Sequence, residues 1–407
     1  MKVLLVNKFF FIKGGAETVY FQERDQLRAA GVEVAEFSMQ HEKNLPSDYS
    51  KWFVSNVDYH GGNSGLSGKL KTARDFIHNS EACQKLNDLL LHVQPDIVHF
   101  HNIYHQLTPS LISVARRFGC KTVLTAHDYK IVCPSYTMLR NGKVCEACLD
   151  GSVFNAFRYR CQEGSAGKSL LLSLEAMWQD VTRHYHQLDA IISPSDFLRN
   201  ILIRKIKDVP VEVIVNGIDD SLQAGDNSDG GYFLYIGRLS REKGVETLAR
   251  AHEMMQHPIP LKIAGDGPLY QDLYSRFPGA EFLGYQQQGE ALNTLIRHAK
   301  AVIVPSEYYE NCSMSVLEAM SFSKPVVGGN IGGIPEQVRD GIEGRLFEPG
   351  NAKALAAILD DLATHPETVQ VMGENARQRL EQKYALRVHT ASLLALYRQL
   401  LSGKPHD

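Results

Sequence analysis

Short apolar runs alternate with helical patterns along most of the chain. An apolar run at 2–6 leads into a loop that ends in Gly14-Gly15, then into apolar residues at helical spacing up to residue 30 and a second apolar run at 32–37. This order of strand, glycine loop, helix and strand is typical of a parallel sheet with helices on both faces. The paired glycines let a ligand approach the backbone closely, although they lack the spacing of the dinucleotide fingerprint. The pattern therefore predicts an α/β fold, with further strands at 97–100, 122–125 and 190–193.

The same rhythm restarts after residue 196. Later apolar runs are each followed by a polar or glycine-rich turn, and they lie at 211–215, 233–236, 261–264 and 302–304. Because ligands of open α/β sheets bind beyond the carboxyl ends of the strands, these turns should share one edge of one sheet. A chain of 407 residues also favours two domains. The expected units are 1–195, 196–378 and a C-terminal helix within 379–407 that packs back toward the first domain.

Composition narrows the class of protein without changing this picture. Hydrophobic residues make up 44% and charged residues 22% of the chain, which is typical of a globular protein. The net charge of −3 argues against a general nucleic-acid binder. No apolar run approaches the roughly 18 residues that suggest a membrane-spanning helix. The apolar start is broken by Asn7 and Lys8 and no cleavage site follows, so we expect a first strand and a cytoplasmic protein.

The stretch 302–320 carries the most specific pattern of polar residues. A buried strand leads through a polar loop into a helix, and Glu310 and Glu318 lie on either side of this junction. Ser313 and Ser315 are plausible helix caps. The start of a helix favours a phosphate, whereas a carboxylate accepts hydrogen bonds from hydroxyl groups. Phosphate and polyol together describe a nucleotide sugar; the alternative is an ordinary strand–helix unit with an acidic loop.

Other polar residues also follow predicted strands. Arg238 and Lys243 are five positions apart on a strand-to-helix turn, where two cations can hold a diphosphate; a solvated surface is the alternative. His127 follows the strand at 122–125 and is the best-placed histidine for a polar contact with a substrate. For His99 and His105, a core or rim position with backbone partners is expected.

Four of the seven cysteines are clustered. Cys133, Cys145, Cys148 and Cys161 form the pattern C-x11-C-x2-C-x12-C within the segment 133–161. In a cytoplasmic chain such a cluster favours metal chemistry over disulfides. The C-x2-C pair supplies two thiolates to a tetrahedral Zn²⁺, and the flanking cysteines could complete a structural site. An iron–sulfur cluster and unliganded thiols stay open as alternatives, and a catalytic metal is not expected because four cysteines leave no open position.

The segment after the cysteines predicts a long amphipathic helix. Its apolar stripe is expected to face the core, and it consists of Leu170, Leu171, Leu174, Met177, Trp178 and Val181.

The order of these motifs resembles that of the retaining glycosyltransferases of family 4. The matching residues are Gly14-Gly15, His127, Asn216-Gly217-Ile218-Asp219, Gly237-Arg238 with Lys243-Gly244, Gly265-Asp266-Gly267-Pro268, and Glu310 through Glu318. The resemblance covers nearly the whole chain and implies the GT-B architecture, in which two Rossmann-like domains face each other across a donor-binding cleft. The first domain would lie on the acceptor side, with the cysteine-rich segment as an insert outside the family's common pattern, and the second would bind the nucleotide sugar.

The resemblance also implies roles for individual residues. Arg238 and Lys243 would bind the donor diphosphate, Glu318 the ribose hydroxyls and Glu310 the sugar hydroxyls. Gly15 would pack against the phosphates and His127 would contact the transferred sugar. The candidate catalytic residues are thus His127, Arg238, Lys243 and Glu310, and the remaining candidates for donor binding are Gly14, Gly237, Gly265, Asp266, Asn311, Cys312, Ser313 and Met314. Family members usually need no metal ion, and the chain has no Asp-x-Asp triplet, so no cofactor is expected for catalysis.

The implied function is transfer of a sugar from a UDP- or GDP-sugar, with retention of anomeric configuration, to a glycan or a polyprenyl-linked acceptor in surface polysaccharide or glycolipid biosynthesis. The alternatives are a sugar-nucleotide epimerase or phosphorylase on the same fold, and a metal-dependent binding protein. Residues 1–190 hold 21 Lys and Arg against 19 Asp and Glu, whereas the remainder holds 22 against 27. This excess of cations favours peripheral contact of the first domain with an anionic membrane surface, on the inner face of the cell membrane, through Lys69, Lys71, Arg74, Arg158 and Arg160.

Overall fold

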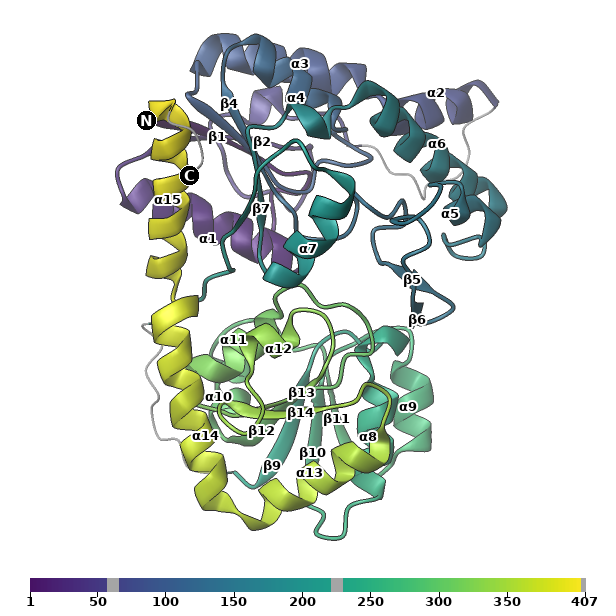
Figure 1. The fold of residues 1–407 in the computed structure, drawn as a ribbon, viewed down its shortest axis with the longest axis vertical. Coiled ribbons are helices and arrows are strands. Elements are labelled where there is room, and N and C mark those ends of the chain that lie inside the picture. The colour runs from purple at the N-terminus through teal and green to yellow at the C-terminus, as the bar shows by residue number, and fades with distance from the viewer. Residues whose placement is uncertain (57–65, 221–229, 404–407) are drawn as a thin grey trace.

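The computed structural model describes residues 1–56, 66–220 and 230–403. It contains two α/β units, one above the other in Figure 1, with the C-terminal helices running along one side of both. Each unit is built on a six-stranded parallel sheet covered by helices on both faces. The structure therefore has the predicted fold class, α/β with two Rossmann-like units.

The first sheet is buried on both faces, which explains why its strands are almost continuously apolar. In spatial order, its parallel strands are β2 (Glu33–Phe37), β1 (Lys2–Val6), β3 (Ile97–Phe100), β4 (Lys121–Thr125), β7 (Ala190–Ser193) and β8 (Val211–Val213). The strand order reverses direction between β1 and β3, and ligands of such sheets bind beyond the strand ends at this point. The loop after β1 and the loops after β3 and β4 are thus placed to form a site.

The helices of the first unit begin at well-formed caps in several places. Asn79 and Ser195 accept hydrogen bonds from the backbone N–H groups of Ala82 and Leu198, respectively. The helical segments are α1 (Gly15–Ala29), η1 (Ser50–Trp52), α2 (Leu66–Ile77), α3 (Ser80–Val93), α4 (Ser110–Arg117), α5 (Asn155–Arg158), α6 (Ala166–Thr182), η2 (Tyr185–Gln187) and α7 (Asp196–Lys205). A hairpin of β5 (Leu139–Arg140) and β6 (Lys143–Val144) lies in the cysteine-rich segment.

The second sheet repeats the topology of the first. Its parallel strands, in spatial order, are β11 (Ala280–Gly284), β10 (Leu261–Ala264), β9 (Tyr232–Ile236), β12 (Ala299–Val304), β13 (Val326–Gly329) and β14 (Gly344–Phe347). The reversal falls between β9 and β12, so the loops after these two strands occupy the position where a ligand is expected. Arg238 follows β9 and Glu310 follows β12.

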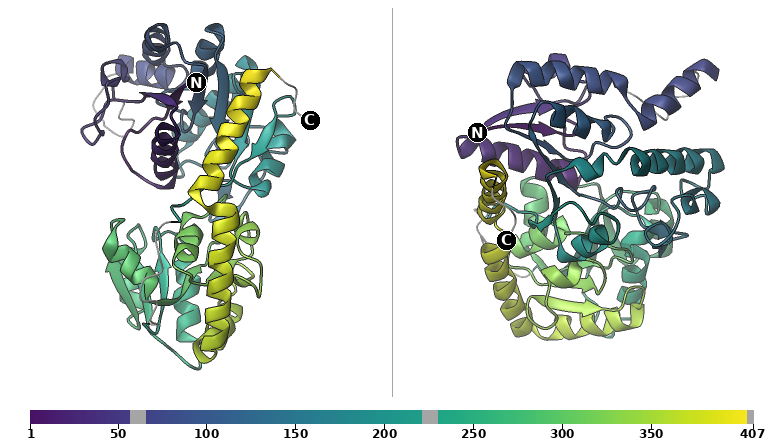
Figure 2. Two further views of the ribbon diagram at one scale, coloured as in Figure 1. Left: turned by 90° about the vertical axis from the view of Figure 1, so that its left-hand side faces the viewer. Right: turned by 45° about the horizontal axis from the view of Figure 1, so that its top comes forward.

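The remaining helices surround the second sheet, except for the last one. They are η3 (Arg241–Lys243), α8 (Val245–Glu253), α9 (Tyr270–Arg276), α10 (Glu290–Arg297), α11 (Met314–Ser321), α12 (Ile334–Gln337), α13 (Ala352–Thr364), α14 (Pro366–Arg379), the π-helical turn η4 (Leu380–Tyr384) and α15 (Leu386–Ser402). Figure 2 shows α14 and α15 as a nearly continuous rod that passes from the second unit to the first.

Helix α15 completes the hydrophobic core of the first unit. Leu393 and Tyr397 are buried together with Val3 and Leu5 of β1 in one cluster, and the hydroxyl of Tyr397 lies 2.7 Å from Nδ1 of His99. The two units are therefore joined by a helix that belongs to the core of the first and follows the second in sequence.

The boundary expected at residue 195 falls between two strands of the first sheet that pair with each other, β7 and β8. Ile191 of β7 pairs with Val211 of β8 in parallel register, and α7 forms the connection between the two strands. Pro194-Ser195 looks like the end of a domain in the sequence, but Ser195 caps α7. We therefore propose that the first unit continues through β8 rather than ending at residue 195.

Helix α6 presents the opposite face to the one predicted from its apolar stripe. The buried residues of α6 include Ser169, Ser173 and Glu175, whereas Trp178 and Val181 are 41% and 71% exposed. Part of the polar face has partners: Glu175 Oε2 lies 2.6 Å from Lys130 Nζ, and the Ser173 hydroxyl donates to a backbone carbonyl. The side-chain amide of Gln179, in contrast, is buried without a hydrogen-bond partner among the described residues. The prediction of a core-facing apolar stripe was wrong because this polar face is the buried one.

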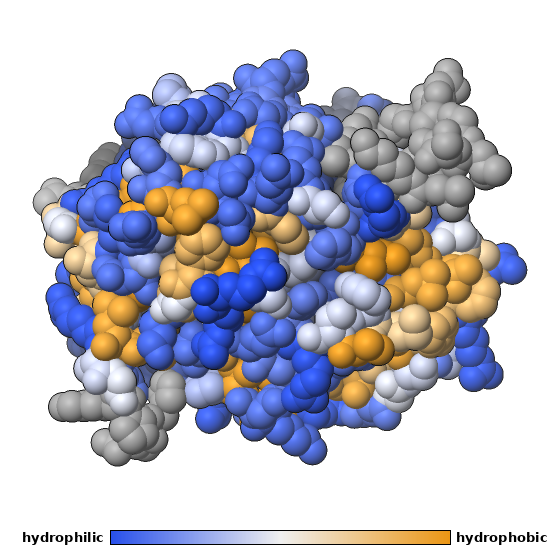
Figure 3. Space-filling model, turned by 90° about the horizontal axis from the view of Figure 1, so that it is seen from above, coloured by the Kyte–Doolittle hydropathy of each residue, from blue (hydrophilic) through white to orange (hydrophobic). Residues whose placement is uncertain are grey.

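The exposed face of α6 continues onto α5. Phe154 and Phe157, at α5, are 37% and 40% exposed, and Arg158 and Arg160 beside them are exposed as well. Figure 3 looks down on the first unit and shows apolar side chains gathered at the edge where α5 and α6 lie. None of the helices that the structure describes combines the length and hydropathy needed to cross a bilayer.

Candidate functional site

The loop after β12 lies against two candidate residues of the first unit. The side-chain amide of Asn311 donates a hydrogen bond to the backbone carbonyl of His127 at 2.9 Å. A Cβ atom on Gly15 would lie 3.5 Å from Cγ of Met314. The structure therefore brings together Gly15, His127 and the segment 310–314, which are about 100 to 300 positions apart in the sequence.

Buried Glu310 and partly exposed Lys243 form an ion pair at the centre of this region. Lys243 Nζ donates to Glu310 Oε1 at 2.8 Å and to the hydroxyl of Tyr308 at 3.0 Å. The same carboxylate accepts from the hydroxyls of Ser306 (2.7 Å) and Tyr308 (2.9 Å). Tyr308 and Ser306 were not singled out in the sequence, although both precede Glu310 by only a few residues.

Glu310 and Lys243 each shift the pKa of the other so that the charged form is favoured. Burial alone would raise the pKa of Glu310, but the Lys243 ammonium and the hydroxyl donors hold it below the usual value. Burial alone would lower the pKa of Lys243, but the Glu310 carboxylate, together with Tyr308, raises it. Both groups are therefore charged at neutral pH, and Glu310 is suited to accept hydrogen bonds from hydroxyls rather than to donate a proton.

Two glycines allow the backbone to form this site. Gly244 has φ +69°, and a Cβ atom there would lie 1.8 Å from the carbonyl oxygen of Pro305. At Gly265 a Cβ atom would lie 1.8 Å from the carbonyl oxygen of Gly237. Larger residues at either position would separate the turns that follow β9, β10 and β12. Gly265 thus packs the turn that contains Asp266 against the turn that contains Arg238.

Arg238 differs from Lys243 because its side chain is exposed. Its position is set by the backbone: its carbonyl accepts from the hydroxyl of Tyr235 at 2.8 Å, and the next residue, Leu239, donates from its N–H to the carbonyl of Asp266 at 2.9 Å. Arg238 is near enough to Tyr136 of the first unit to lower the pKa of that phenol, although burial dominates and raises it. The guanidinium is therefore held at the boundary of the two units.

Glu318 lines a cavity that lies between the two units. The cavity has a volume of about 150 Å³ and is bordered by Thr18 and Gln22 of α1 as well as by Gln288 and Met314 of the second unit. Burial raises the pKa of Glu318 to about 7, against a smaller lowering by a hydrogen bond from Gln288. Oε1 of Gln22 is buried and has no hydrogen-bond partner among the described residues. A ligand with hydroxyl or N–H donors would satisfy both groups.

The start of α11 has no side-chain cap. Ser313 occupies the N-cap position but its side chain makes no capping hydrogen bond, and its N–H donates to Gln337 at 2.8 Å. The hydroxyl of Ser315 donates to the carbonyl of Ile236. The expected caps are therefore not formed, and Oδ1 of Asn311 close by is a further buried acceptor without a partner in the part of the chain that the structure describes. Cys312 lies between these residues, and burial raises the pKa of its thiol to about 12.

A buried network of polar side chains connects His127 to α15. Nε2 of His127 lies 2.9 Å from Nδ1 of His101, and Nε2 of His101 lies 3.4 Å from Oε2 of Glu23. The other oxygen of Glu23 lies 3.1 Å from Nε2 of His389 on α15. Burial lowers the pKa of His127 to about 4, so its ring is neutral at neutral pH.

The charge of this network resides on Glu23 and His389. Burial would raise the pKa of Glu23, but the nearby imidazoles of His101, His389 and His99 lower it. Burial would lower the pKa of His389, but Glu23 raises it. The signal for this network in the sequence was the position of Glu23, a carboxylate on the apolar face of a predicted helix.

Glu23, His99 and His101 also place three possible metal-ligand atoms within 4.8 Å of one another. Both ring nitrogens of His99 already have partners, however: Nδ1 lies 2.7 Å from the Tyr397 hydroxyl and Nε2 lies 2.8 Å from Oγ1 of Thr125. The arrangement fits a hydrogen-bond network better than a metal site, and His99 is a satisfied core histidine, although by side-chain hydroxyls rather than by backbone.

Comparison with known proteins decides the family. A family model described as Glycosyltransferase Family 4 matches residues 13–222, and one described as Glycosyl transferases group 1 matches residues 219–379. The chain belongs to glycosyltransferase family 4.

Curated relatives within this group match only part of the chain. The chain is 33% identical over 165 residues to sulfoquinovosyl transferase SQD2 of Arabidopsis thaliana. The aligned region covers 39% of the chain and 32% of that protein. The chain is 30% identical over 177 residues to the alpha-D-kanosaminyltransferase of Streptomyces kanamyceticus (41% and 45%) and 32% identical over 183 residues to a glycogen synthase of Mycobacterium tuberculosis (42% and 44%). The chain thus spans about a third to a half of the length of these relatives.

Solved structures match over the whole chain and show the fold. The sucrose-phosphate synthase of Thermosynechococcus elongatus superimposes with a TM-score of 0.70 at 19% identity and covers 99% of the chain and 100% of that protein. Alr3699/HepE of Anabaena, in complex with UDP-glucose, has a TM-score of 0.68 at 17% identity, with 98% and 100% coverage. The two parallel six-stranded sheets of this family 4 protein are those of the GT-B architecture.

Proposed function

We propose that this family 4 protein transfers a sugar from a UDP- or GDP-sugar to a glycan or lipid-linked acceptor with retention of anomeric configuration. The observation that carries the proposal is the placement of two different carboxylates before and after the start of α11. Glu310 is ionised and paired with Lys243, whereas Glu318 lines the cavity between the units beside the unpartnered Gln22 Oε1. The first suits sugar hydroxyls and the second suits the ribose, with the start of α11 between them.

The diphosphate would lie between these carboxylates. Breaking the bond from the anomeric carbon to phosphate builds negative charge on the leaving group, and stabilising that charge lowers the barrier. Arg238, Lys243 and the backbone N–H groups at the start of α11 are the donors available for this purpose. The turn that contains Gly237 and the turn that contains Gly265 and Asp266 hold Arg238 in place. Catalysis in this proposal needs no metal ion.

The first unit would bind the transferred sugar and the acceptor. Gly14-Gly15 brings the backbone of α1 close to the donor phosphates, because a side chain at Gly15 would occupy the space next to Met314. His127 is neutral and would contact a sugar hydroxyl as a hydrogen-bond partner. Attack from the side on which the diphosphate leaves would retain configuration, with a phosphate oxygen taking the proton of the acceptor hydroxyl.

Incubation with a panel of UDP- and GDP-sugars tests the proposal. Slow release of free sugar and nucleotide from one donor would support a transferase that acts on water in place of its acceptor. Isomerised donor would indicate an epimerase, and release of sugar phosphate with inorganic phosphate as the acceptor would indicate a phosphorylase. A protein that leaves every donor intact and binds none of them by calorimetry would contradict the proposal.

An acceptor carried by a membrane lipid would be met by the first unit. This proposal is supported by the exposed aromatic and cationic residues of α5 and α6, since apolar side chains flanked by Arg158 and Arg160 suit an anionic membrane surface. Of the other expected cations, Arg74 is exposed and paired with Asp75, whereas the side chains of Lys69 and Lys71 lie outside the described residues. Contact with the inner face of the cell membrane and a role in surface polysaccharide or glycolipid synthesis follow from this proposal.

A further inference from the structure

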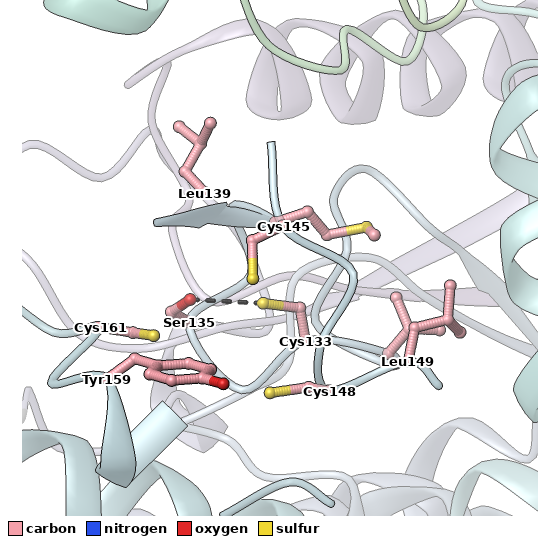
Figure 4. Close-up of a pocket in the computed structure, with 10 residues that line it drawn as sticks. Cys133, Ser135, Leu139, Cys145, Cys148, Leu149, Tyr159 and Cys161 are labelled. Atoms are coloured by element: carbon pink, nitrogen blue, oxygen red, sulfur yellow. Dashed lines mark hydrogen bonds between the residues drawn. The ribbon is translucent and has the colours of Figure 1, made fainter. Parts of the chain in front are cut away.

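The four clustered cysteines line one small cavity in the segment between β4 and α6, with their sulfur atoms, as a group, spaced more widely than the 4.8 Å within which the ligand atoms of Glu23, His99 and His101 lie. Cys133 comes from the loop after β4, Cys145 and Cys148 follow the β5–β6 hairpin, and Cys161 follows α5. Figure 4 shows their sulfur atoms directed toward a common space. The cavity has a volume of about 10 Å³ and all four cysteines line it.

The chemistry of the cavity favours a soft metal ion. Apart from the cysteines it is lined mainly by apolar residues such as Val132, Met138 and Leu149, and no carboxylate or imidazole is among its lining residues. The Ser135 hydroxyl lies 3.3 Å from Sγ of Cys133. Thiolates select Zn²⁺ or iron–sulfur clusters among biological metals. A space of about one water-sized sphere has room for a single ion.

The backbone around the four cysteines adopts unfavourable conformations at several residues. The cysteine-rich segment and the turn after it contain little regular structure, yet several non-glycine residues there adopt positive φ angles: Tyr136, Met138, Asn141, Arg160 and Glu163. Each such conformation costs of the order of 1 kcal/mol or more and persists only where other interactions impose it. A metal with four protein ligands supplies such a constraint.

We propose that Cys133, Cys145, Cys148 and Cys161 bind one Zn²⁺ ion in a closed, structural tetrathiolate site. The thiolates are the four ligands of a tetrahedral ion, and each cysteine releases its proton on binding. Because four protein ligands leave no open position, the ion orders the segment and does not take part in sugar transfer.

The proposed zinc site would position residues at the cleft between the units. Glu146, between Cys145 and Cys148, accepts from the hydroxyl of Tyr309 at 3.0 Å, and Tyr309 directly precedes Glu310. The turn of the hairpin also reaches the second unit, because a Cβ atom on Gly142 would lie 3.0 Å from Arg241. The metal site stands on its own geometry, whereas this consequence for the cleft rests on the proposed function.

Metal analysis of the wild-type protein, purified under reducing conditions without chelator, is the first test. We expect about one Zn²⁺ per chain, with an X-ray absorption spectrum of four sulfur ligands at about 2.3 Å. Cys145→Ser and Cys148→Ser should each lose most of the zinc. Cys83→Ser is the matched control, since Cys83 is also half-buried but lies on α3 with its sulfur 3.2 Å from the Ser110 hydroxyl; it should retain the full zinc content.

A second measurement covers the case in which the cysteine variants do not fold. Removing zinc from the wild-type protein with a chelator should open residues 134–160 to limited proteolysis while both sheets stay protected, and added Zn²⁺ should reverse the change. Iron with visible absorption, or zinc below about a tenth of the single equivalent expected for a closed site, would overturn the proposal. Zinc retained in Cys145→Ser and Cys148→Ser would also overturn it and would point to another site, such as Glu23 with His99 and His101.

Discussion

The ion pair of Glu310 and Lys243 fixes the charges of both groups before any ligand binds. Their 2.8 Å contact is accompanied by hydrogen bonds from the hydroxyls of Tyr308 and Ser306 to Glu310. Without Lys243, Glu310 would be a buried charge without its cationic partner. A loss of activity in Lys243→Ala would therefore combine a lost phosphate contact with a disturbed Glu310. Arg238 is exposed, which makes it the clearer test of diphosphate binding.

Arg238→Ala is expected to lower kcat by about 10²–10³-fold, the usual effect of removing one group that stabilises developing negative charge. The free energy of unfolding should change by less than about 0.5 kcal/mol because the side chain is exposed. Steady-state kinetics and urea unfolding measure the two effects. Lys262→Ala, which removes a cation of the same unit from a 3.8 Å pair with Glu281, is the control and should leave kcat unchanged. Normal turnover of Arg238→Ala would remove this residue from the site.

Nucleotide affinity should depend on pH through Glu318. Burial raises the pKa of this carboxyl to about 7, and only its ionised form accepts two hydrogen bonds from ribose hydroxyls. The affinity for UDP or GDP, measured by calorimetry, should therefore rise as the pH increases from about 6 to 8, and Glu318→Gln should remove this part of the dependence. The variant also controls for titration of the nucleotide phosphate near pH 6. Parallel pH profiles of wild type and Glu318→Gln would argue against the ribose contact.

The contribution of Glu318 to folding stability changes with pH in the opposite direction to its contribution to nucleotide affinity. Because the folded-state pKa lies above that of the unfolded chain, the folded protein binds the proton more tightly, and stability falls as the pH rises through about 7. Ionisation of Glu318 is therefore expected to strengthen nucleotide binding and to lower the stability of the fold.

At the scale of elements, the turns after the strands were predictable and the buried face of α6 was not. The loops with Arg238, Asp266 and Glu310 were placed at one sheet edge from local pattern, because strand ends in a parallel sheet share an edge. The inverted face of α6 was not, since its buried Glu175 depends on Lys130 from another segment. The contact of Glu23 with His389 joins residues 366 positions apart, and no local pattern encodes such a pairing.

The link between α1 and α15 can be tested through this buried pair. His389→Ala leaves Glu23 charged and without its partner, which should lower the free energy of unfolding by about 3–5 kcal/mol in urea titrations. Adding Glu23→Gln should restore part of this loss, since the double variant buries no unpaired charge. A double variant whose destabilisation equals the sum of the single effects would show that the two residues do not interact.

Because α5 and α6 expose an apolar face, we expect the protein to bind anionic vesicles. Replacing both Phe157 and Trp178 by alanine should weaken binding in a flotation assay several-fold, because aromatic side chains anchor proteins at the membrane interface. Val371→Ala is the control, since Val371 is 56% exposed but lies on α14 in the second unit. Equal binding of wild type and the double variant would show that this face does not meet the membrane.

At the scale of the whole molecule, neither unit is complete without the rod formed by α14 and α15. Deletion of 386–402 should expose the side of the first core that includes Val3 and Leu5, while leaving the core of the second unit intact. Hydrogen exchange should then be faster in β1 and β3 and unchanged in β9 and β12. The two-domain architecture was predictable from the repeated strand–helix rhythm, but the extent to which α15 belongs to the first core was not, since its contacts are made at long range.

The position of α15 also determines the order in which the two units can complete their cores during synthesis on the ribosome. Between the end of β8 at Val213 and the start of α15 at Leu386, translation takes roughly 10 to 35 seconds at typical rates. During that interval the unit that is synthesised first lacks the helix that covers its core, whereas the unit synthesised second already has all of its strands. The core of the N-terminal unit is therefore completed last, and its apolar side stays uncovered until α15 has been synthesised.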